Sequence, residues 1–326
     1  MPKATIHDII TTQWVRDTFM PGVTLLDNDG VPIPEVAYVD ALNAAISQTE
    51  SELSITIDPI EVSAERFDLT NRETQAFWPV RLTRRPLIAV TEYHWQIGTL
   101  QAVNALPLEW IDIQNAKRSL LHVMPVRRAM EPEMLIPVEL GTMAMFRSDY
   151  LPGWWSFTYR AGFRAYTTDV VIPAGQTTAT LTFATGETFL TSQYSVNTGL
   201  VSPNNADADI TVTVTERRVA AADLRLSRAP AHDTTVRLWT MDMPDSLKSL
   251  IGIRAAKNPL AFAGDFVLGV GILSRNTSMD GLSQSHTTTK KGRGALGDRL
   301  TNLEMREVDL LRAVCAAYPM MNIIGI

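Results

Sequence analysis

The stretch ITVTVTERRV, residues 210–219, alternates isoleucine and valine with threonine at a period of two before its charged residues. The same alternation occurs in TTATLTF, residues 177–183, and in TTVRLWTM, residues 234–241. The turn-forming clusters PAGQ, VNTG and SPNNADAD separate these stretches. Alternation with turns between the repeats predicts short antiparallel strands. We therefore expect residues 166–240 to form an all-β, β-sandwich-like domain.

Helical periodicity occurs on both sides of this region. PEVAYVDALNAAISQTESEL, residues 34–53, repeats apolar residues on one face. PDSLKSLIGIRAAK, residues 244–257, does the same, and we expect this helix to stop before Pro259. A last amphipathic helix is predicted over about residues 297–318.

Extended patterns fill much of the N-terminal half. We expect strands in LSITIDPI, residues 53–60, and PLIAVTEYHW, residues 86–95. Further strands are expected in SLLHVMP, residues 119–125, and WWSFTYRAGF, residues 154–163. The sequence thus predicts an α+β fold in which a helical/β core is interrupted by an inserted β-sandwich-like domain. The predicted domains are 1–165, 166–240 and 241–326, of which the first and last form the core.

Composition is that of a folded globular chain. The 326 residues are 45% hydrophobic and 20% charged. No run approaches the roughly 20 apolar residues of a membrane span, and the N-terminus lacks the pattern of a signal peptide. The single cysteine, Cys315, excludes an internal disulfide and a cysteine-based metal site, and we expect it to lie in an apolar helical stretch and to pack in the core. A net charge of −6 gives no global attraction to nucleic acid.

Gly292, Gly294 and Gly297 have the G-x-G-x-x-G spacing of a dinucleotide-binding turn. That motif requires a buried strand before it and an acidic residue about 20 positions after it. SQSHTTTKK, residues 283–291, is too polar for a buried parallel strand, and the last acidic residue is Asp309. We therefore interpret the glycines as a turn before the last helix and expect no cofactor.

Catalytic motifs are absent from the sequence. There is no G-x-S-x-G elbow and no H-E-x-x-H, so we expect no catalytic or metal-ligating residues and no enzymatic activity. The histidines are scattered singly, without ligand spacing: His7, His94, His122, His232 and His286.

Two C-terminal segments suggest contacts with a partner. KKGRGALGDR, residues 290–299, is either a solvated loop or a segment that orders against an acidic partner surface or DNA phosphates. The apolar tail YPMMNIIGI, residues 318–326, either packs on its own domain or docks into a neighbouring subunit.

The residues from PDSLKSLIGIRAAK through SMDGLSQS, 244–285, followed by a closing helix that ends AAYPMMNIIG, resemble the C-terminal half of head–tail connector (adaptor) proteins of tailed bacteriophages. Farther upstream, a helix followed by ELSITIDPIEV, RLTRRPLIAVTEYHW and WWSFTYRAGF resembles the element order of such proteins. The resemblance covers residues 36–163 and 244–326. The β insert lies outside the compact connector pattern.

This resemblance implies a virion structural protein at the neck, made in the cytoplasm of the bacterial host. Connectors form a ring, often a dodecamer, under the portal protein and join it to a downstream neck or tail protein. Double-stranded DNA passes through the channel without sequence-specific binding, and no membrane is involved. The residues expected to dock on the portal or on a neighbouring subunit are Lys290, Lys291, Gly292, Arg293, Gly294, Gly297, Met320, Met321, Ile323 and Ile324. The insert is expected on the outside of the ring.

Three alternatives remain open at this level. The chain could be another virion component, such as a tail-completion or collar protein, or an enzyme with an unrecognised site. It could also bind a carbohydrate or a receptor through the β insert, which would require exposed aromatic residues. The aromatics available there are Phe183, Phe189, Tyr194 and Trp239, and the strand patterns place Phe183 and Trp239 in the core.

Overall fold

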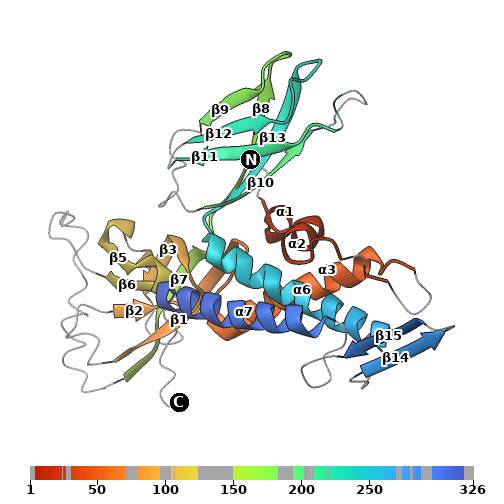
Figure 1. Ribbon diagram of the computed structural model, residues 1–326. Helices are drawn as coiled ribbons and strands as arrows, with labels where there is room; N and C mark the ends of the chain where they lie inside the picture. The colour runs from red at the N-terminus through yellow and green to blue at the C-terminus, as the bar shows by residue number, and fades with distance from the viewer. Residues whose placement is uncertain are drawn as a thin grey trace. The chain divides into compact units, whose positions relative to one another are not determined.

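The computed structural model in Figure 1 describes most of the chain. The described residues are 4–23, 25–26, 31–70, 79–95, 104–105, 107–123, 150–182, 194–201, 207, 209–218, 221–268, 274–279, 282–287 and 296–318. They contain helices and antiparallel sheets, so the predicted α+β class is confirmed. No helix in these ranges is long and apolar enough to cross a membrane.

The chain folds as two compact units. The first unit combines Met1–Leu53 with Arg164–Ile326, and the second unit is Ser54–Phe163. This grouping follows packing, whereas the domain limits at residues 165 and 240 follow composition. Those limits remain a prediction.

The second unit consists of two antiparallel sheets that share one core. The strand orders are β1-β7-β3-β4 and β2-β6-β5. Side chains of both sheets fill the core, and the rings of Tyr93 and Phe157 stack with centroids 5.8 Å apart. The strands are β1 (Ile60–Thr70), β2 (Pro79–Arg81), β3 (Leu87–Trp95), β4 (Asn104–Ala105), β5 (Ile111–Asn115), β6 (Leu120–Val123) and β7 (Tyr150–Ala161).

The predicted strand over residues 53–60 is wrong. Leu53 is the last residue of a helix, and β1 begins only at Ile60, after Pro59. Proline has no N–H to donate to a ladder, and it therefore suits a position just outside a strand. The extended residues before it are tied by single backbone bonds: Thr56 donates to the carbonyl of Arg85, and Ile57 accepts from Phe163.

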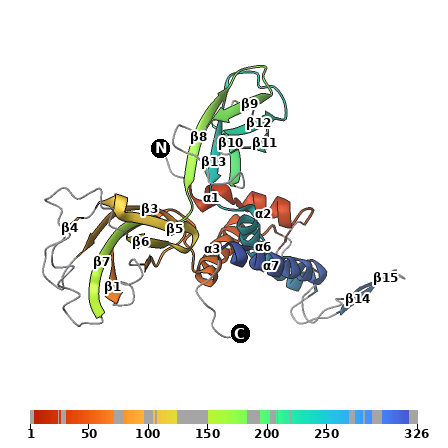
Figure 2. The same ribbon diagram turned by 90° about the vertical axis from the view of Figure 1, so that its left-hand side faces the viewer.

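The helices of the first unit are centred on α6. Helices α2, α3 and α7 each pack against α6, and Figures 1 and 2 show them lying along it. Buried apolar residues follow one another along α6, including Leu247, Leu250, Ile251 and Ile253. The described helices are α1 (Ile6–Ile9), α2 (Thr12–Phe19), α3 (Glu35–Leu53), α6 (Asp245–Leu268) and α7 (Gly297–Ala317).

Helix α6 does not stop before Pro259, as the sequence predicted, but continues through it to Leu268. Proline leaves the carbonyl four residues earlier without its helical donor, which is destabilising. Pro259 and its neighbour Leu260 are both buried. Their packing offsets the missing hydrogen bond, which is why tertiary contacts override the local signal here.

The insert folds as two three-stranded antiparallel sheets around a common core. Their strand orders are β10-β13-β8 and β11-β12-β9. Leu238 of one sheet and Leu224 of the other are both almost fully buried in this core, so the arrangement is a sandwich. The strands are β8 (Ala165–Ile172), β9 (Thr178–Thr182), β10 (Ser195–Leu200), β11 (Val212–Arg217), β12 (Ala221–Leu226) and β13 (Thr234–Met241).

A two-stranded hairpin separates α6 from α7 along the chain. Strand β14 (Ser274–Met279) pairs antiparallel with β15 (Leu282–Thr287). Only Asp280 and Gly281 lie between the two strands in sequence, and Asp-Gly is a strong hairpin signal. Neither strand of the hairpin was among the predicted elements.

Candidate assembly site

Most of the residues predicted to dock lie outside the described ranges. These are Lys290, Lys291, Gly292, Arg293, Gly294, Met320, Met321, Ile323 and Ile324. Their roles stay predictions. Gly297 is described: it is the first residue of α7 and is buried. Among the described residues, the strand that precedes it most closely, β15, belongs to an antiparallel hairpin, whereas a dinucleotide-binding turn follows a parallel strand.

Arg299, at the end of the basic segment, has a structural role. Its guanidinium donates hydrogen bonds to the carbonyl of Phe19, at 3.2 Å, and to that of Pro21, at 3.4 Å. Phe19 is the last residue of α2, where carbonyl groups lack helical partners and a positive charge is favourable. Arg299 therefore fixes the first turn of α7 on the end of α2.

A buried ion-pair network, centred on Arg254 of α6, joins the three long helices. The Arg254 side chain is 4% exposed. Its Nε donates to Glu307 of α7 at 2.8 Å, and its other nitrogens donate to Thr49 and Glu52 of α3. Lys257, one turn along α6, donates to the second oxygen of Glu307 at 2.8 Å. The network thus sets how α3 and α7 pack on α6.

The charges in this network are balanced and hydrogen-bonded. Burial acts to raise the pKa of Glu307, but hydrogen bonds from Lys257 and Arg254 outweigh it, so the pKa lies below its ordinary value. The sequence carried a signal for this site, because Arg254 and Lys257 interrupt the apolar stretch LIGIRAAK within α6. What it lacked was the identity of their partners, more than 45 residues away in the chain.

Polar contacts also join the insert to the helices. Ser195 of β10 donates its hydroxyl to the carbonyl of Met243 at 2.8 Å. Asn197 donates to the carbonyl of Asp8 in α1 at 2.7 Å. Arg217 of β11 pairs with Asp245, the first residue of α6, at 2.7 Å. Strand β10 is therefore held to α1 and to the start of α6.

Lys248 lies at the centre of this junction. Its Nζ donates to the carbonyl of Val196 at 3.1 Å and lies 4.6 Å from the ring centroid of Trp14. Burial is the main cause that lowers its pKa, to about 8; Asp245 acts in the opposite direction and Arg217 in the same one. A buried lysine with one carbonyl partner favours a fixed junction, because moving the strand would leave the ammonium unpaired.

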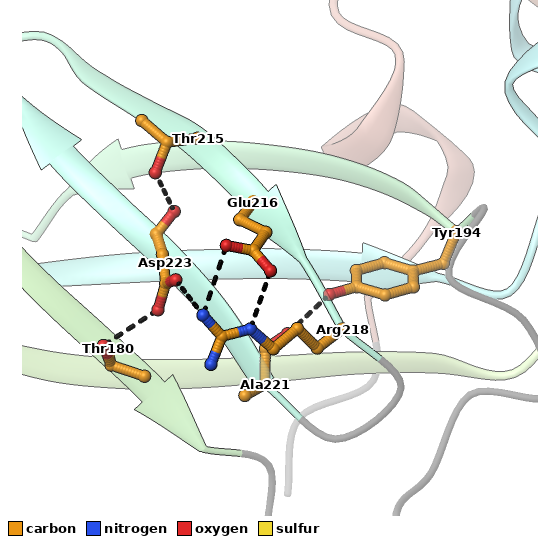
Figure 3. A network of polar contacts seen from close by, with 7 residues as sticks. All are labelled: Thr180, Tyr194, Thr215, Glu216, Arg218, Ala221 and Asp223. Atoms are coloured by element: carbon orange, nitrogen blue, oxygen red, sulfur yellow. Dashed lines mark hydrogen bonds and ion pairs between the residues drawn. The ribbon is translucent and has the colours of Figure 1, made fainter.

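The insert carries an exposed polar network around the end of β11, shown in Figure 3. Arg218 bonds both carboxylate oxygens of Glu216, at 2.9 and 3.2 Å, and one oxygen of Asp223 at 2.7 Å. The other oxygen of Asp223 accepts from Thr180 of β9 at 2.8 Å. These contacts connect β9, β11 and β12. Because the side chains satisfy one another, the network braces the sheet.

The aromatic residues of the insert fit a carbohydrate platform poorly. Tyr194 is fully buried, and Phe183 and Phe189 lie outside the described residues. Trp239 was predicted to be in the core, and this is wrong: the core residues of β13 alternate with it, and it is half-buried on the outer face. A Cβ at Gly199 would lie 2.9 Å from the Trp239 ring, so the ring covers β10.

Two further polar side chains are shielded from solvent to different degrees. Arg85 is 4% exposed, and its Nε donates to the carbonyl of Ser54 at 2.8 Å. Cys315 is half-buried in α7, and burial, followed by the charge of Glu52, raises its pKa. Within the described ranges, no group of three or more histidine, cysteine or acidic residues could hold a metal ion.

Comparisons with known proteins give little independent guidance. No family model matches the sequence, and no curated protein matches it. A solved structure, the neck of an empty GTA particle computed with C6 symmetry, is similar with a TM-score of 0.29 and 12% identity. The similarity covers 50% of this chain and 70% of that one. A TM-score at this level does not establish a shared fold.

Proposed function

We propose that this chain is a structural protein of a phage-type virion, an adaptor at the head–tail junction. In this proposal it forms a ring under the portal protein, joins the portal to a downstream neck or tail protein, and surrounds the DNA channel. It catalyses no reaction and needs no cofactor. The β insert faces the outside of the ring.

The supporting observation is how the segment that resembles connectors is folded. The described residues of this segment lie in α6, β14 and β15, and α7 belongs to the same compact unit. Arg254 ties α6 to α3 and α7 through buried ion pairs. A rigid helical layer that presents a hairpin between two of its helices suits a protein whose task is to position other proteins. The net charge of −6 is compatible with DNA passing without binding.

Antibody labelling of the insert on intact and tail-stripped particles, viewed by electron microscopy, tests the proposal. We expect label at one vertex, between head and tail. Label along the tail or on fibres would instead assign another structural role, such as a tail-completion or collar protein. Absence of label, with no antigen on a blot of purified particles, would refute a virion role.

A further inference from the structure

The two outer helices of the helical layer each expose apolar side chains beside the face that packs on α6. On α3, Val36 is 66% exposed and Val39 is 38% exposed. On α7, Met305 is 58% exposed and Val308 is 47% exposed. Each pair is three residues apart, and so each forms a short stripe on its helix.

These stripes lie beside the residues that each helix buries. Helix α3 packs inward through residues such as Leu42 and Ile46, and α7 through Leu300 and Leu303. At about 100° per residue, Val36 lies about 120° around α3 from Leu42, and Val39 lies about 60° from it, at the flank of the buried face. The same spacing places Met305 about 140° and Val308 about 80° around α7 from Leu300. Because both helices pack on α6, the layer has one apolar stripe at each of two different edges.

Charge near the two stripes is complementary. Helix α3 contains four acidic residues and no lysine or arginine, and Asp40, beside Val36 and Val39, is exposed. On α7, Arg312 follows Val308 by one turn, and its side chain is 78% exposed. Its ion-pair partner Asp309 is equally exposed and 3.7 Å away, which makes that pair weak. Arg312 is thus able to pair with a carboxylate on another molecule.

We infer that the outer face of α7, with Met305, Val308 and Arg312, docks on the outer face of α3, with Val36, Val39 and Asp40, of a second copy of this chain. Different patches on one molecule that fit each other give a head-to-tail contact, which continues from copy to copy and closes into a ring when the rotation fits. Acidic α3 disfavours DNA as the occupant, and the matched apolar and charged positions favour a second copy. This inference rests on the proposed ring and identifies the surface that forms it.

Disulfide trapping tests the contact on the full-length chain with Cys315→Ser as the background. The variants Val36→Cys and Val308→Cys are mixed under mild oxidation, and a chain carrying both substitutions is treated in the same way. We expect covalent dimers from the mixture, a ladder of multimers from the double variant, and no dimers from either single variant alone. Val171→Cys paired with Val308→Cys is the matched control, because Val171 is a similarly exposed valine, at 60%, on β8.

Charge reversal provides a second readout. We expect Asp40→Arg or Arg312→Asp to reduce trapping about fivefold, and the two together to restore it, since an exposed ion pair contributes modestly. Equal trapping of the Val171 control, homodimers from Val36→Cys alone, or no ladder would overturn the inference. If particle labelling succeeds while trapping fails, only the docking surface is wrong. If trapping succeeds and particles lack the chain, self-association stands and the virion role falls.

Discussion

Replacing Arg254 with methionine should destabilise the helical layer more than any exposed substitution. Methionine keeps the length and apolar stem of arginine but removes the hydrogen bonds to Glu307, Glu52 and Thr49. Removing one partner of a buried ion pair typically costs 3–5 kcal/mol, because the other charge stays buried. Here Glu307 keeps Lys257, and Glu52 is 37% exposed, so we expect the low end, about 3 kcal/mol.

Hydrogen exchange measured by mass spectrometry on peptides of α3, α6 and α7 reports the loss of stability in each of these helices separately. Exchange is preferable to a global melting temperature, since a chain with two compact units need not unfold in one step. Arg237→Met is the control: Arg237 bonds Asp169 through two nitrogens, at 2.7 and 2.8 Å, but its side chain is 36% exposed. We expect a much smaller change in the exchange of β13.

The pH dependence gives an independent check. The folded pKa of Glu307 lies below the ordinary value of 4.5, so its contribution is complete above that pH and is lost as the pH falls through the folded pKa. The difference between wild type and Arg254→Met should therefore shrink as the pH falls below about 4.5. Equal effects of Arg254→Met and Arg237→Met, or a difference that does not depend on pH, would refute the reasoning that burial makes this network strong.

Three further outcomes are expected. The pKa of Lys248 is about 8 in the folded chain against 10.5 in the unfolded chain, so the unfolded chain binds more protons between these pH values. The free energy of unfolding of the wild type, relative to that of Lys248→Met, should therefore rise with pH over this window by about 3 kcal/mol at most. Urea unfolding at several pH values measures this rise. Gly252→Ala places a Cβ 2.3 Å from Phe19 and 2.7 Å from Trp14, and overpacking of about 1–3 kcal/mol should outweigh the gain in helix propensity of about 1 kcal/mol, seen as faster exchange in α2. With only two residues between them, Met279 and Leu282 close the hairpin as a hydrogen-bonded pair, and pairs of this kind recur at every second residue. The N–H of Thr277 therefore points to β15, whereas that of Asn276 points outward. Thr277→Pro should abolish the exchange protection of β14 and β15, and Asn276→Pro should preserve it.

Local patterns predicted the elements whose own residues decide their structure. The alternation in TTVRLWTM gave a strand over the same residues as β13, and the helical period of residues 34–53 gave α3 within one residue. Both segments bury every second or every third to fourth residue, so period and burial coincide. The prediction was wrong at Pro259. The local preference of proline would end the helix there, but buried residues around Pro259 stabilise α6 beyond it.

The candidate site was less accessible to sequence reasoning, for a physical reason. The basic loop and the apolar tail could be identified from the sequence because their composition alone distinguishes them from ordinary surface segments. Arg254 and Lys248 matter only because of what folds against them: carboxylates of α3 and α7 for the first, and the carbonyl of Val196 and the ring of Trp14 for the second. The spacing along the chain cannot reveal such pairs, since they join residues from different elements.

Helix α6 is the element on which both the other helices and the insert pack. Its buried residues are covered by α2, α3 and α7, and the insert is fixed to its first turn through Lys248 and Asp245. Each covering helix thus has one face committed to α6. The exposed valines and methionine of the described helices lie beside that face, on α3 and α7, whereas the insert attaches at the start of α6. The proposed contacts between copies and the contacts of the insert can therefore change independently, because a substitution of Met305 leaves the packing of α7 on α6, and with it the attachment of the insert, intact.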